Sequence, residues 1–369
     1  YMKLEDAITF DDVLLVPAKS SVTPDMVDTK TFVTKNIKLN IPLISSAMDT
    51  VTEKNMAIAM AQSGGIGVIH RNLSISRQAK YVSAVKRFES GIVYNPITLK
   101  CDDTIKIAKK IAERYNITGF PVVDKENKVL GILTNRDIRF LDDNSIKVSE
   151  VMTKENLAIV KEPINSKEAK HIMAKRRIEK LLVVDESNYL LGLLTIKDIE
   201  KSVLNPLACK DELGRLRCAA ASSVGNEGYE RSVSLIDSGA DVIVIDTAHG
   251  HSLDVINAVK RLKKEFANTQ VIAGNVVTSE ATKELIDVGA DSIKVGIGPG
   301  SICTTRIIAG VGMPQLTAII NCAKEADLRN IPVIADGGIR FSGDFAKSIA
   351  SGASCAMIGS LFAGTDESP

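Results

Sequence analysis

The sequence predicts an α/β protein whose main body is a (β/α)8 barrel, and three observations support this fold class. Short apolar segments that end in polar or glycine residues recur along the chain, and most are followed by an amphipathic stretch, as in the βα units of a parallel sheet. Several helix-like stretches end in glycine just before the next apolar segment. A stretch of different character, with its own internal repeat, interrupts the series.

Eight apolar segments are expected to form the barrel strands, accompanied by seven helices. The strands are predicted at residues 41–46, 66–70, 216–221, 242–246, 271–275, 292–296, 333–336 and 356–359. Four of them follow a glycine that would form a left-handed helix cap and turn the chain into the strand. These glycines are Gly64, Gly239, Gly289 and Gly352. The regular punctuation indicates one repeating architecture, a TIM barrel.

The interrupting stretch covers residues 92–204 and repeats itself at an offset of 61 residues. Residues 120–124 and 131–138 align with residues 181–185 and 192–199, and each half is predicted to run helix, strand, turn, strand, helix. Without this stretch the chain has close to the roughly 250 residues of a complete TIM barrel. The stretch is therefore predicted to be inserted within the barrel.

Each repeated unit resembles a CBS domain, and the two copies resemble the tandem (Bateman) pair that binds adenine or guanine nucleotides. The resemblance implies a catalytic barrel at residues 1–91 and 205–369, with CBS domains at 92–148 and 149–204. It also implies that the threonine and aspartate of each Thr-x-x-Asp step contact an allosteric nucleotide. Alternatively, each threonine only caps the following helix, with the aspartate in its first turn. The residues concerned are Thr134, Asp137, Thr195 and Asp198.

The charge balance argues against nucleic acid or membrane partners. Forty-six lysines and arginines face 45 aspartates and glutamates, for a formal net charge of +1. No apolar run reaches the roughly 18 residues of a transmembrane helix, and the first residues show no signal-peptide pattern. We therefore expect a cytoplasmic protein.

Six cysteines are spread along the chain without CxxC pairs or histidines at metal spacing, so neither a disulfide framework nor a zinc site is expected. Cys101, Cys218, Cys322 and Cys355 lie in or beside apolar segments and are predicted to pack as small hydrophobic residues. Cys303 has a different, polar neighbourhood.

Cys303 lies in a glycine-rich segment that follows the sixth predicted strand, at the carboxyl-terminal face where TIM barrels carry out chemistry. Residues 296–306 read Gly-Ile-Gly-Pro-Gly-Ser-Ile-Cys-Thr-Thr-Arg. Glycines let the backbone approach a ligand closely, and a nearby cation with oriented amides would lower the pKa of the thiol. The segment alone fits a tight turn with an incidental cysteine equally well.

The other predicted strand ends favour the catalytic interpretation, because barrel sites are assembled from several strand ends. Polar groups follow the first, fourth, fifth, seventh and eighth strands, at residues 45–49, 246–249, 274–275, 335–339 and 359–360. Glycines after the last two strands lie where barrels commonly bind phosphate through exposed amides. A monophosphate ligand fits this position.

Together these strings resemble the IMP dehydrogenase and GMP reductase group, IMP being inosine 5′-monophosphate. The resemblance implies that Cys303 attacks C2 of IMP, that a hydride passes to NAD, and that water releases xanthosine monophosphate (XMP) from a covalent thioimidate, in guanine nucleotide synthesis.

The resemblance also assigns residues to each ligand. Cys303 and Thr305 are implied as catalytic. The IMP contacts are implied to be Ser46, Ser301, Asp336, Gly337, Gly338, Gly359 and Ser360, and the NAD contacts Asp246, Asn275, Gly296, Ile297 and Gly298. Carbonyls of Gly298, Gly300 and Cys303 match half of a potassium site, since oxygen ligands suit a hard cation.

Four positions are left open or declined. Lys294 is a weaker candidate near the purine and the cofactor, and so is Met48, which could equally be a packing residue. His70 is expected to be a packed ring at a strand end, and His249 a neighbour of the site.

Family members continue past the eighth strand into a mobile flap and a tail, which carry a water-activating arginine and tyrosine and the rest of the potassium site. The sequence, which ends at Pro369, is expected to lack them. The resemblance further implies homotetramers, and octamers formed when nucleotide-loaded CBS pairs stack.

Three alternatives remain. One is a GMP reductase that uses NADPH, although the CBS pair and residues 306–312 and 364–365 resemble the dehydrogenases more. The second is a nucleotide-sensing CBS protein with an inert barrel. The third is a flavin-dependent barrel oxidoreductase, which would use the same phosphate-binding strand ends.

Overall fold

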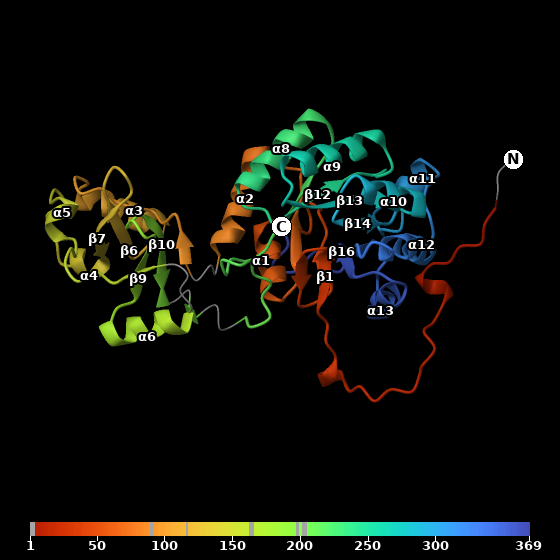
Figure 1. Cartoon of the computed structure of the whole chain (residues 1–369), viewed down its shortest axis with the longest axis horizontal. Helices are drawn as coiled ribbons and strands as arrows, with labels where there is room; N and C mark the ends of the chain where they lie inside the picture. The colour runs from red at the N-terminus through yellow and green to blue at the C-terminus, as the bar shows by residue number, and fades with distance from the viewer. Residues whose placement is uncertain (1–3, 89–91, 116, 162–165, 197–198, 201–204) are drawn as a thin grey trace. The chain divides into compact units, whose positions relative to one another are not determined.

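The computed structural model describes residues 4–88, 92–115, 117–161, 166–196, 199–200 and 205–369. The chain divides into two compact units (Figure 1). The first consists of Tyr1–Phe88, Leu207–Asp211 and Leu216–Pro369, and the second of Glu89–Pro206 and Glu212–Arg215. Each unit is described by itself below.

The first unit is built on a closed barrel of parallel strands, which confirms the predicted fold class. Around the barrel the order is β11-β12-β13-β14-β15-β16-β3-β4. The strands are β3 (Leu43–Ser45), β4 (Ile66–Ile69), β11 (Ala219–Ser222), β12 (Val242–Asp246), β13 (Gln270–Val276), β14 (Ser292–Val295), β15 (Val333–Asp336) and β16 (Cys355–Ile358). All eight overlap their predicted positions. β11 begins later than predicted, because Leu216 instead forms a bridge with Lys210.

Helices follow seven of these strands and cover the outside of the barrel (Figure 1). They are α1 (Lys54–Gln62), α2 (Ile75–Arg87), α8 (Gly225–Asp237), α9 (Leu253–Glu265), α10 (Ser279–Asp287), α12 (Gln315–Asp327) and α13 (Ser342–Ala350), and a short α11 (Thr305–Ile308) precedes α12. The predicted glycine caps are confirmed, because all four glycines have a left-handed φ between 92° and 105°.

Two layers of apolar side chains stabilise the barrel. An outer cluster packs between the strands and the helices, and an inner cluster fills the barrel. Side chains alternate between the two layers along each strand: Val242 and Val244 lie inside, whereas Ile243 and Ile245 lie outside. This alternation decides which strand-end residues face the barrel interior.

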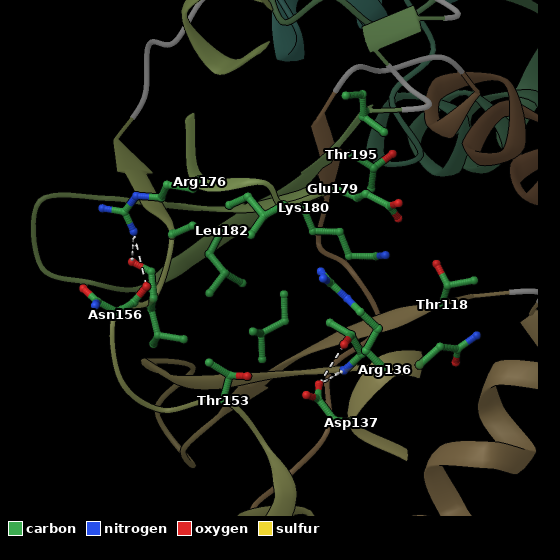
Figure 2. Close-up of a pocket in the computed structure, with 17 residues that line it drawn as sticks. Thr118, Arg136, Asp137, Thr153, Asn156, Arg176, Glu179, Lys180, Leu182 and Thr195 are labelled. Carbon is green, nitrogen blue, oxygen red and sulfur yellow. Dashed lines mark hydrogen bonds between the residues drawn. The ribbon is translucent and has the colours of Figure 1, made fainter. Parts of the chain in front are cut away.

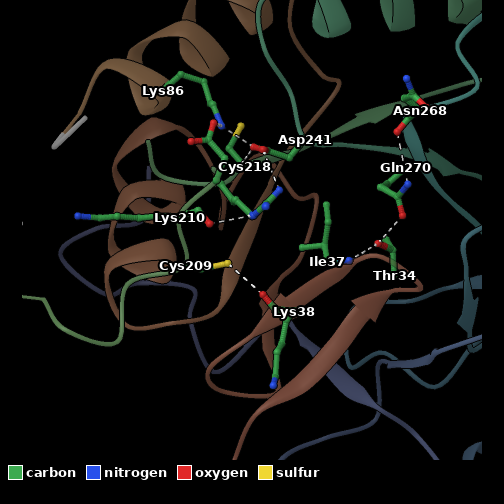
Figure 3. A network of polar contacts seen from close by, with 12 residues as sticks. Thr34, Ile37, Lys38, Lys86, Cys209, Lys210, Cys218, Asp241, Asn268 and Gln270 are labelled. Atoms are coloured by element: carbon green, nitrogen blue, oxygen red, sulfur yellow. Dashed lines mark hydrogen bonds and ion pairs between the residues drawn. The ribbon is translucent and has the colours of Figure 1, made fainter. Parts of the chain in front are cut away.

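The amino-terminal end of the barrel is closed by a hairpin of β1 (Thr31–Thr34) and β2 (Ile37–Leu39). Val33, Ile37 and Leu39 are buried in the inner cluster, and the Thr34 hydroxyl donates to Gln270 (Figure 3). The opposite, carboxyl-terminal end is therefore the one left available to ligands.

Polar contacts at this floor also bring together the two chain segments that flank the inserted unit. Lys86, near the end of α2, lies 3.0 Å from Asp211 and 2.8 Å from Asp241. Arg217 lies 3.3 Å from Asp241, which also accepts from the Cys218 amide (Figure 3). Lys86 and Asp211 are both buried, so the network fixes the chain where it leaves and re-enters the barrel.

The second unit contains two similar strand pairs. β6 (Gly119–Val123) and β7 (Val129–Thr134) form an antiparallel pair, and β9 (Lys180–Val184) and β10 (Leu190–Thr195) form another, extended by β5 (Ile92–Tyr94) and β8 (Ile159–Lys161). The helices whose bounds lie within its described residues are α3 (Ile105–Tyr115), α4 (Asn135–Ile138), α5 (Val148–Val151) and α6 (Ser166–Arg176). No helix in the described ranges of the whole chain is long and apolar enough to cross a membrane.

Candidate active site

Three barrel strands carry a charged side chain on the inner face near their carboxyl ends: Asp246 on β12, Lys294 on β14 and Asp336 on β15. The residue before each of them packs in the outer cluster, so alternation turns the charged side chain inward. The three outward-facing residues are Ile245, Ile293 and Ala335.

Lys294 joins the three charges into one network. Its Nζ lies 2.8 Å from Asp246 Oδ1 and 2.6 Å from Asp336 Oδ2. Burial opposes the charged amine, but the two carboxylates outweigh it and raise the pKa of Lys294 above its ordinary value. Burial likewise opposes the charge of Asp246, yet the neighbouring ammonium lowers the pKa of this carboxyl. The charge of Arg71 lowers the pKa of Asp246 in the same direction, while the Lys294 ammonium is shared by the two carboxylates.

Two amide side chains hold Asp336 in place. Asn275 Nδ2 donates to Asp336 Oδ2 at 2.9 Å and to the Gly296 carbonyl at 2.7 Å. Gln315 Nε2 donates to the Asp336 carbonyl at 3.1 Å. The Oδ1 atom of Asn275 is buried and accepts no hydrogen bond from the residues that the structure describes. This orphaned acceptor suits a ligand that brings an N–H or O–H donor.

The glycine-rich segment leads from β14 to α11, and close contacts explain why its first residue is glycine. Gly296 has φ +143°, and a Cβ there would lie 2.1 Å from the Asp336 carbonyl oxygen. Gly298 has φ +83°, and a Cβ there would lie 2.5 Å from the Arg306 side chain. The loop can therefore pass between β15 and Arg306 only with glycine at these positions.

The Cys303 thiol is held at the end of this loop. Its Sγ donates to Thr305 Oγ1 at 3.3 Å, and its amide donates to the Gly300 carbonyl at 3.0 Å. The Thr305 hydroxyl lowers the pKa of Cys303, and backbone hydrogen bonds and the Arg306 charge act in the same direction against partial burial. The thiol is thus set up to ionise.

Four other cysteines have the opposite environment. Burial raises the pKa of Cys209 and Cys218 to about 12 and that of Cys322 to about 11, and it raises the pKa of Cys355 as well. Cys218, Cys322 and Cys355 are buried as predicted, and Cys101, although only partly buried, packs against a hydrophobic cluster of the second unit.

A cavity of about 520 Å³ opens at the catalytic face. It brings together every residue predicted to contact IMP, and Met48 as well. Those residues are Ser46, Ser301, Asp336, Gly337, Gly338, Gly359 and Ser360. Cys303 is not part of the lining, although its neighbours Ile302 and Arg306 are.

Glycines shape one wall of the cavity. Gly337 and Gly338 have φ of +90° and +82°, and a Cβ on Gly359 would lie 2.9 Å from Ser46 Oγ. Glycine at both positions permits a tight turn with exposed backbone amides, and exposed amides suit an anion. This wall is where the sequence predicts a phosphate.

The residues predicted for NAD lie beside this cavity and do not line it. Asp246 and Asn275 connect to it through Lys294 and Asp336. The amide oxygen of Asn275 and the backbone of the glycine loop fit a nicotinamide cofactor, which carries both donors and acceptors.

The carbonyls predicted for potassium lie within one tight loop. The Gly300 carbonyl already accepts from the Cys303 amide, but a carbonyl oxygen has two lone pairs and can still bind a cation. Three carbonyl oxygens fit a hard monovalent cation, and no cluster of acidic, histidine or cysteine side chains in the described ranges competes for a metal.

An amino-terminal segment forms a further wall that the sequence did not reveal. Thr9, Phe10 and Asp11 line the cavity. The segment is fixed by a hydrogen bond from the Ile8 amide to Thr317 at 2.8 Å and by an ion pair between Asp11 and Arg340. Its one sequence signal is the capping pair Thr9 and Asp12, where the carboxylate accepts from the Thr9 amide.

Three histidines, His70, His249 and His251, lie outside the set of predicted catalytic residues. His70 is buried, and its Nδ1 accepts from the Asn72 amide at 3.1 Å. His251 pairs with Glu284 at 2.7 Å on the outside, and His249 is exposed.

The second unit contains a separate pocket of about 890 Å³, formed by residues of both halves (Figure 2). It includes Thr134, Asp137 and Thr195; Asp198 lies outside the described residues. Asp137 Oδ2 accepts from the Thr134 amide at 2.7 Å and from its hydroxyl at 2.8 Å, which caps α4. The pair therefore caps a helix and lines the pocket.

The fold and the site together define a barrel protein with a cysteine thiol of lowered pKa beside a glycine-lined cavity. The profile of the family described as "IMP dehydrogenase / GMP reductase domain" matches residues 7–369. The chain belongs to this family.

Named relatives extend over almost the whole chain. It is 57% identical over 369 residues to inosine-5′-monophosphate dehydrogenase of Aquifex aeolicus, covering all of this chain and 75% of that protein. It is 57% identical over 365 residues to the enzyme of the same name from Rhizobium tropici, covering 99% and 73%. A solved structure of GMP reductase from Trypanosoma brucei with guanosine 5′-triphosphate superposes with a TM-score of 0.89 at 41% identity, covering 99% and 89%.

Proposed function

We propose that this chain is an IMP dehydrogenase, which oxidises IMP to XMP with NAD in guanine nucleotide synthesis. The observation that carries the proposal is the Cys303 thiol, with its lowered pKa, next to a cavity that contains all the residues expected to bind IMP. The high identity to dehydrogenases over the whole chain supports it.

In this mechanism Cys303 is the nucleophile. Its thiolate adds to C2 of IMP, which makes that carbon tetrahedral and electron-rich, so that hydride can leave. The Thr305 hydroxyl, 3.3 Å from the sulfur, stabilises the thiolate before the attack. Loss of hydride leaves a thioimidate on Cys303, which water hydrolyses to XMP with release of the thiol.

The remaining residues hold IMP in the orientation that the attack requires. Asp336 accepts hydrogen bonds from the ribose hydroxyls, and Ser46 and Ser301 contribute hydroxyl groups. Gly337, Gly338, Gly359 and Ser360 provide amides and a hydroxyl for the phosphate. Fixing both ends of the nucleotide places C2 against the sulfur.

Asp246, Asn275, Gly296, Ile297 and Gly298 would hold NAD, which supplies hydride acceptance when bound. Carbonyls of Gly298, Gly300 and Cys303 would hold a potassium ion that stabilises the loop. Because the cation would bind the backbone of the nucleophile loop, potassium is expected to raise activity.

GMP reductase is the second candidate, since the structural similarity to a reductase is also high. The decisive assay follows NADH absorbance with IMP, NAD and potassium, beside Cys303→Ala and beside GMP with NADPH. NADH formation that is lost in Cys303→Ala supports the dehydrogenase. NADPH consumption with GMP would replace it by the reductase, and inactivity in both assays would favour a regulatory protein with an inert barrel.

We propose that residues 92–148 and 149–204 are two CBS domains that bind purine nucleotides in the second pocket through Thr134, Asp137 and Thr195. Arg136, Arg176 and Lys180 outnumber the acidic Asp137 and Glu179 in the lining of this pocket, and this balance suits a phosphate (Figure 2). We further propose that the chain forms a homotetramer, which stacks into octamers when nucleotide is bound. We also propose a cytoplasmic location, which is favoured by the free cysteines. A variant that lacks residues 92–204 and keeps the full nucleotide response would contradict the regulatory role.

A further inference from the structure

We propose that Lys294 is a positioning residue that couples the two ligand-binding halves of the site, by holding one carboxylate on the substrate side and one on the cofactor side. The inference rests on the proposed function, which assigns Asp336 to IMP and Asp246 to NAD.

The sheet register explains how one lysine reaches both carboxylates. Asp246, Gly274 and Lys294 lie side by side on β12, β13 and β14. A Cβ on Gly274 would lie 2.7 Å from Lys294 Cβ and 2.5 Å from its carbonyl oxygen. The absence of a side chain on β13 therefore lets the lysine cross this strand to Asp246. Asp336 lies on the other side, on β15, which pairs directly with β14.

The lysine occupies only one oxygen of each carboxylate. Asp246 uses Oδ1 and Asp336 uses Oδ2, which also accepts from Asn275. In the described part of the chain, no hydrogen bond reaches Asp336 Oδ1 or Asp246 Oδ2. Asp336 also lines the cavity. Each carboxylate is therefore oriented by the lysine through one oxygen and can offer the other to its ligand.

The coupling follows from charge. Lys294 is only 3% exposed, so water cannot replace a lost partner. One ammonium is shared by two anions, and a ligand or substitution that changes Asp246 changes how strongly Lys294 holds Asp336. A residue on the cofactor side thus acts on substrate affinity although it does not touch the substrate.

The test measures IMP affinity by calorimetry without cofactor, in the wild-type chain, Lys294→Met, Asp246→Asn and the double variant. Lys294→Met is expected to weaken IMP binding about tenfold or more, because it removes the ammonium that pairs with both carboxylates. Asp246→Asn is expected to change IMP affinity several-fold while Lys294 is present and to have no further effect in Lys294→Met. Lys294→Arg should restore much of the binding, because a guanidinium can also serve two carboxylates.

Lys263→Met is the matched control. Lys263 forms an ion pair of 2.8 Å with the buried Asp291. Asp291 directly precedes β14, the strand that carries Lys294, so this ion pair lies at the end of the barrel opposite to the site. Lys263→Met should lower stability and leave IMP affinity unchanged. Equal IMP affinity in wild type and Lys294→Met, or additive effects of the two substitutions, would overturn the inference. Should Lys294→Met fail to fold, the Asp246→Asn and Lys294→Arg variants still decide it. A wild-type chain that binds no IMP would instead refute the proposed function.

Discussion

The sulfur of Cys303 lies 3.3 Å from the hydroxyl oxygen of Thr305, two residues later in the chain. This short spacing places both groups on the turn that starts α11, so the local backbone sets their distance. The contact lowers the pKa of the thiol, whereas burial raises the pKa of Cys209, Cys218 and Cys322. One cysteine is thereby made reactive among several that are kept inert.

Thr305→Val should therefore make Cys303 less acidic. The thiolate is the reactive form and exists above the thiol pKa, so removing the hydroxyl should shift the alkylation profile to higher pH. The measurement is the rate of iodoacetamide labelling at Cys303 against pH, read by peptide mass spectrometry without substrate. Thr304→Val, at an exposed neighbour, should leave the profile in place. An unshifted Thr305→Val profile would show that the hydroxyl does not stabilise the thiolate.

Cys303→Ala should abolish turnover and retain IMP binding. The thiol supplies the covalent bond, whereas the cavity that holds the nucleotide is lined by other residues. Quenched wild-type reactions should contain a nucleotide adduct on the peptide with Cys303, and the variant should contain none. An adduct on another cysteine would reject the assignment of the nucleophile.

Gly296→Ala should destabilise the protein by about 1–3 kcal/mol or more, because the added Cβ meets the Asp336 carbonyl and the backbone φ disfavours alanine. Activity should fall with it, since Asp336 would have to move. Thermal unfolding provides the measurement. Gly343→Ala is the control: it lies in α13, a Cβ there meets nothing within 4 Å, and it should be neutral or slightly stabilising. Equal melting temperatures for the two variants would contradict the steric argument.

Phe10→Ala should weaken IMP binding and stability together. Phe10 is 2% exposed, lines the cavity and packs in the outer cluster, and truncating a buried phenylalanine typically costs about 3–5 kcal/mol. Calorimetric IMP affinity and thermal unfolding report the two effects. Asp11→Asn, which breaks the half-exposed pair with Arg340, should cost less than about 1 kcal/mol. A normal IMP affinity in Phe10→Ala would mean that the amino-terminal wall does not contribute to the site.

Arg136→Ala should weaken purine nucleotide binding in the second pocket and leave unregulated IMP turnover unchanged. Arg136 lines that pocket and belongs to the other compact unit. Titration with ATP and with GTP, followed by calorimetry, measures the loss. Arg139 lies at the end of the same short helix and does not line the pocket. The control variant Arg139→Ala should therefore bind both nucleotides normally. Unaltered binding in Arg136→Ala would locate the phosphates elsewhere.

Most of the barrel could be predicted from the sequence, because its signals are local. An apolar run, a following amphipathic stretch and a cap such as Gly239 all lie within a few residues of one another. The residues that line the IMP cavity could be predicted for the same reason. Parallel strands in a closed barrel all end on one face, so a polar residue at the end of a predicted strand is expected on that face.

Other parts of the site could not be predicted, because they depend on contacts between distant segments. Phe10 reaches the cavity through hydrogen bonds such as that from Ile8 to Thr317, which no periodicity encodes. The bridge by Lys294 depends on the lateral register of β12, β13 and β14. A sequence reveals that Gly274 is small, but only the register shows what crosses it.

The buried pair of Lys86 and Asp211 has a consequence for how such a chain could have arisen. The two residues flank the inserted unit and meet at 3.0 Å on the floor of the barrel, at the end away from Cys303. A gene segment spliced in at this point need not alter any group that touches the nucleotide, and its removal would leave two ends close enough to rejoin. The chemistry and the inserted unit can therefore evolve, and be recombined in the laboratory, as separate exchangeable modules.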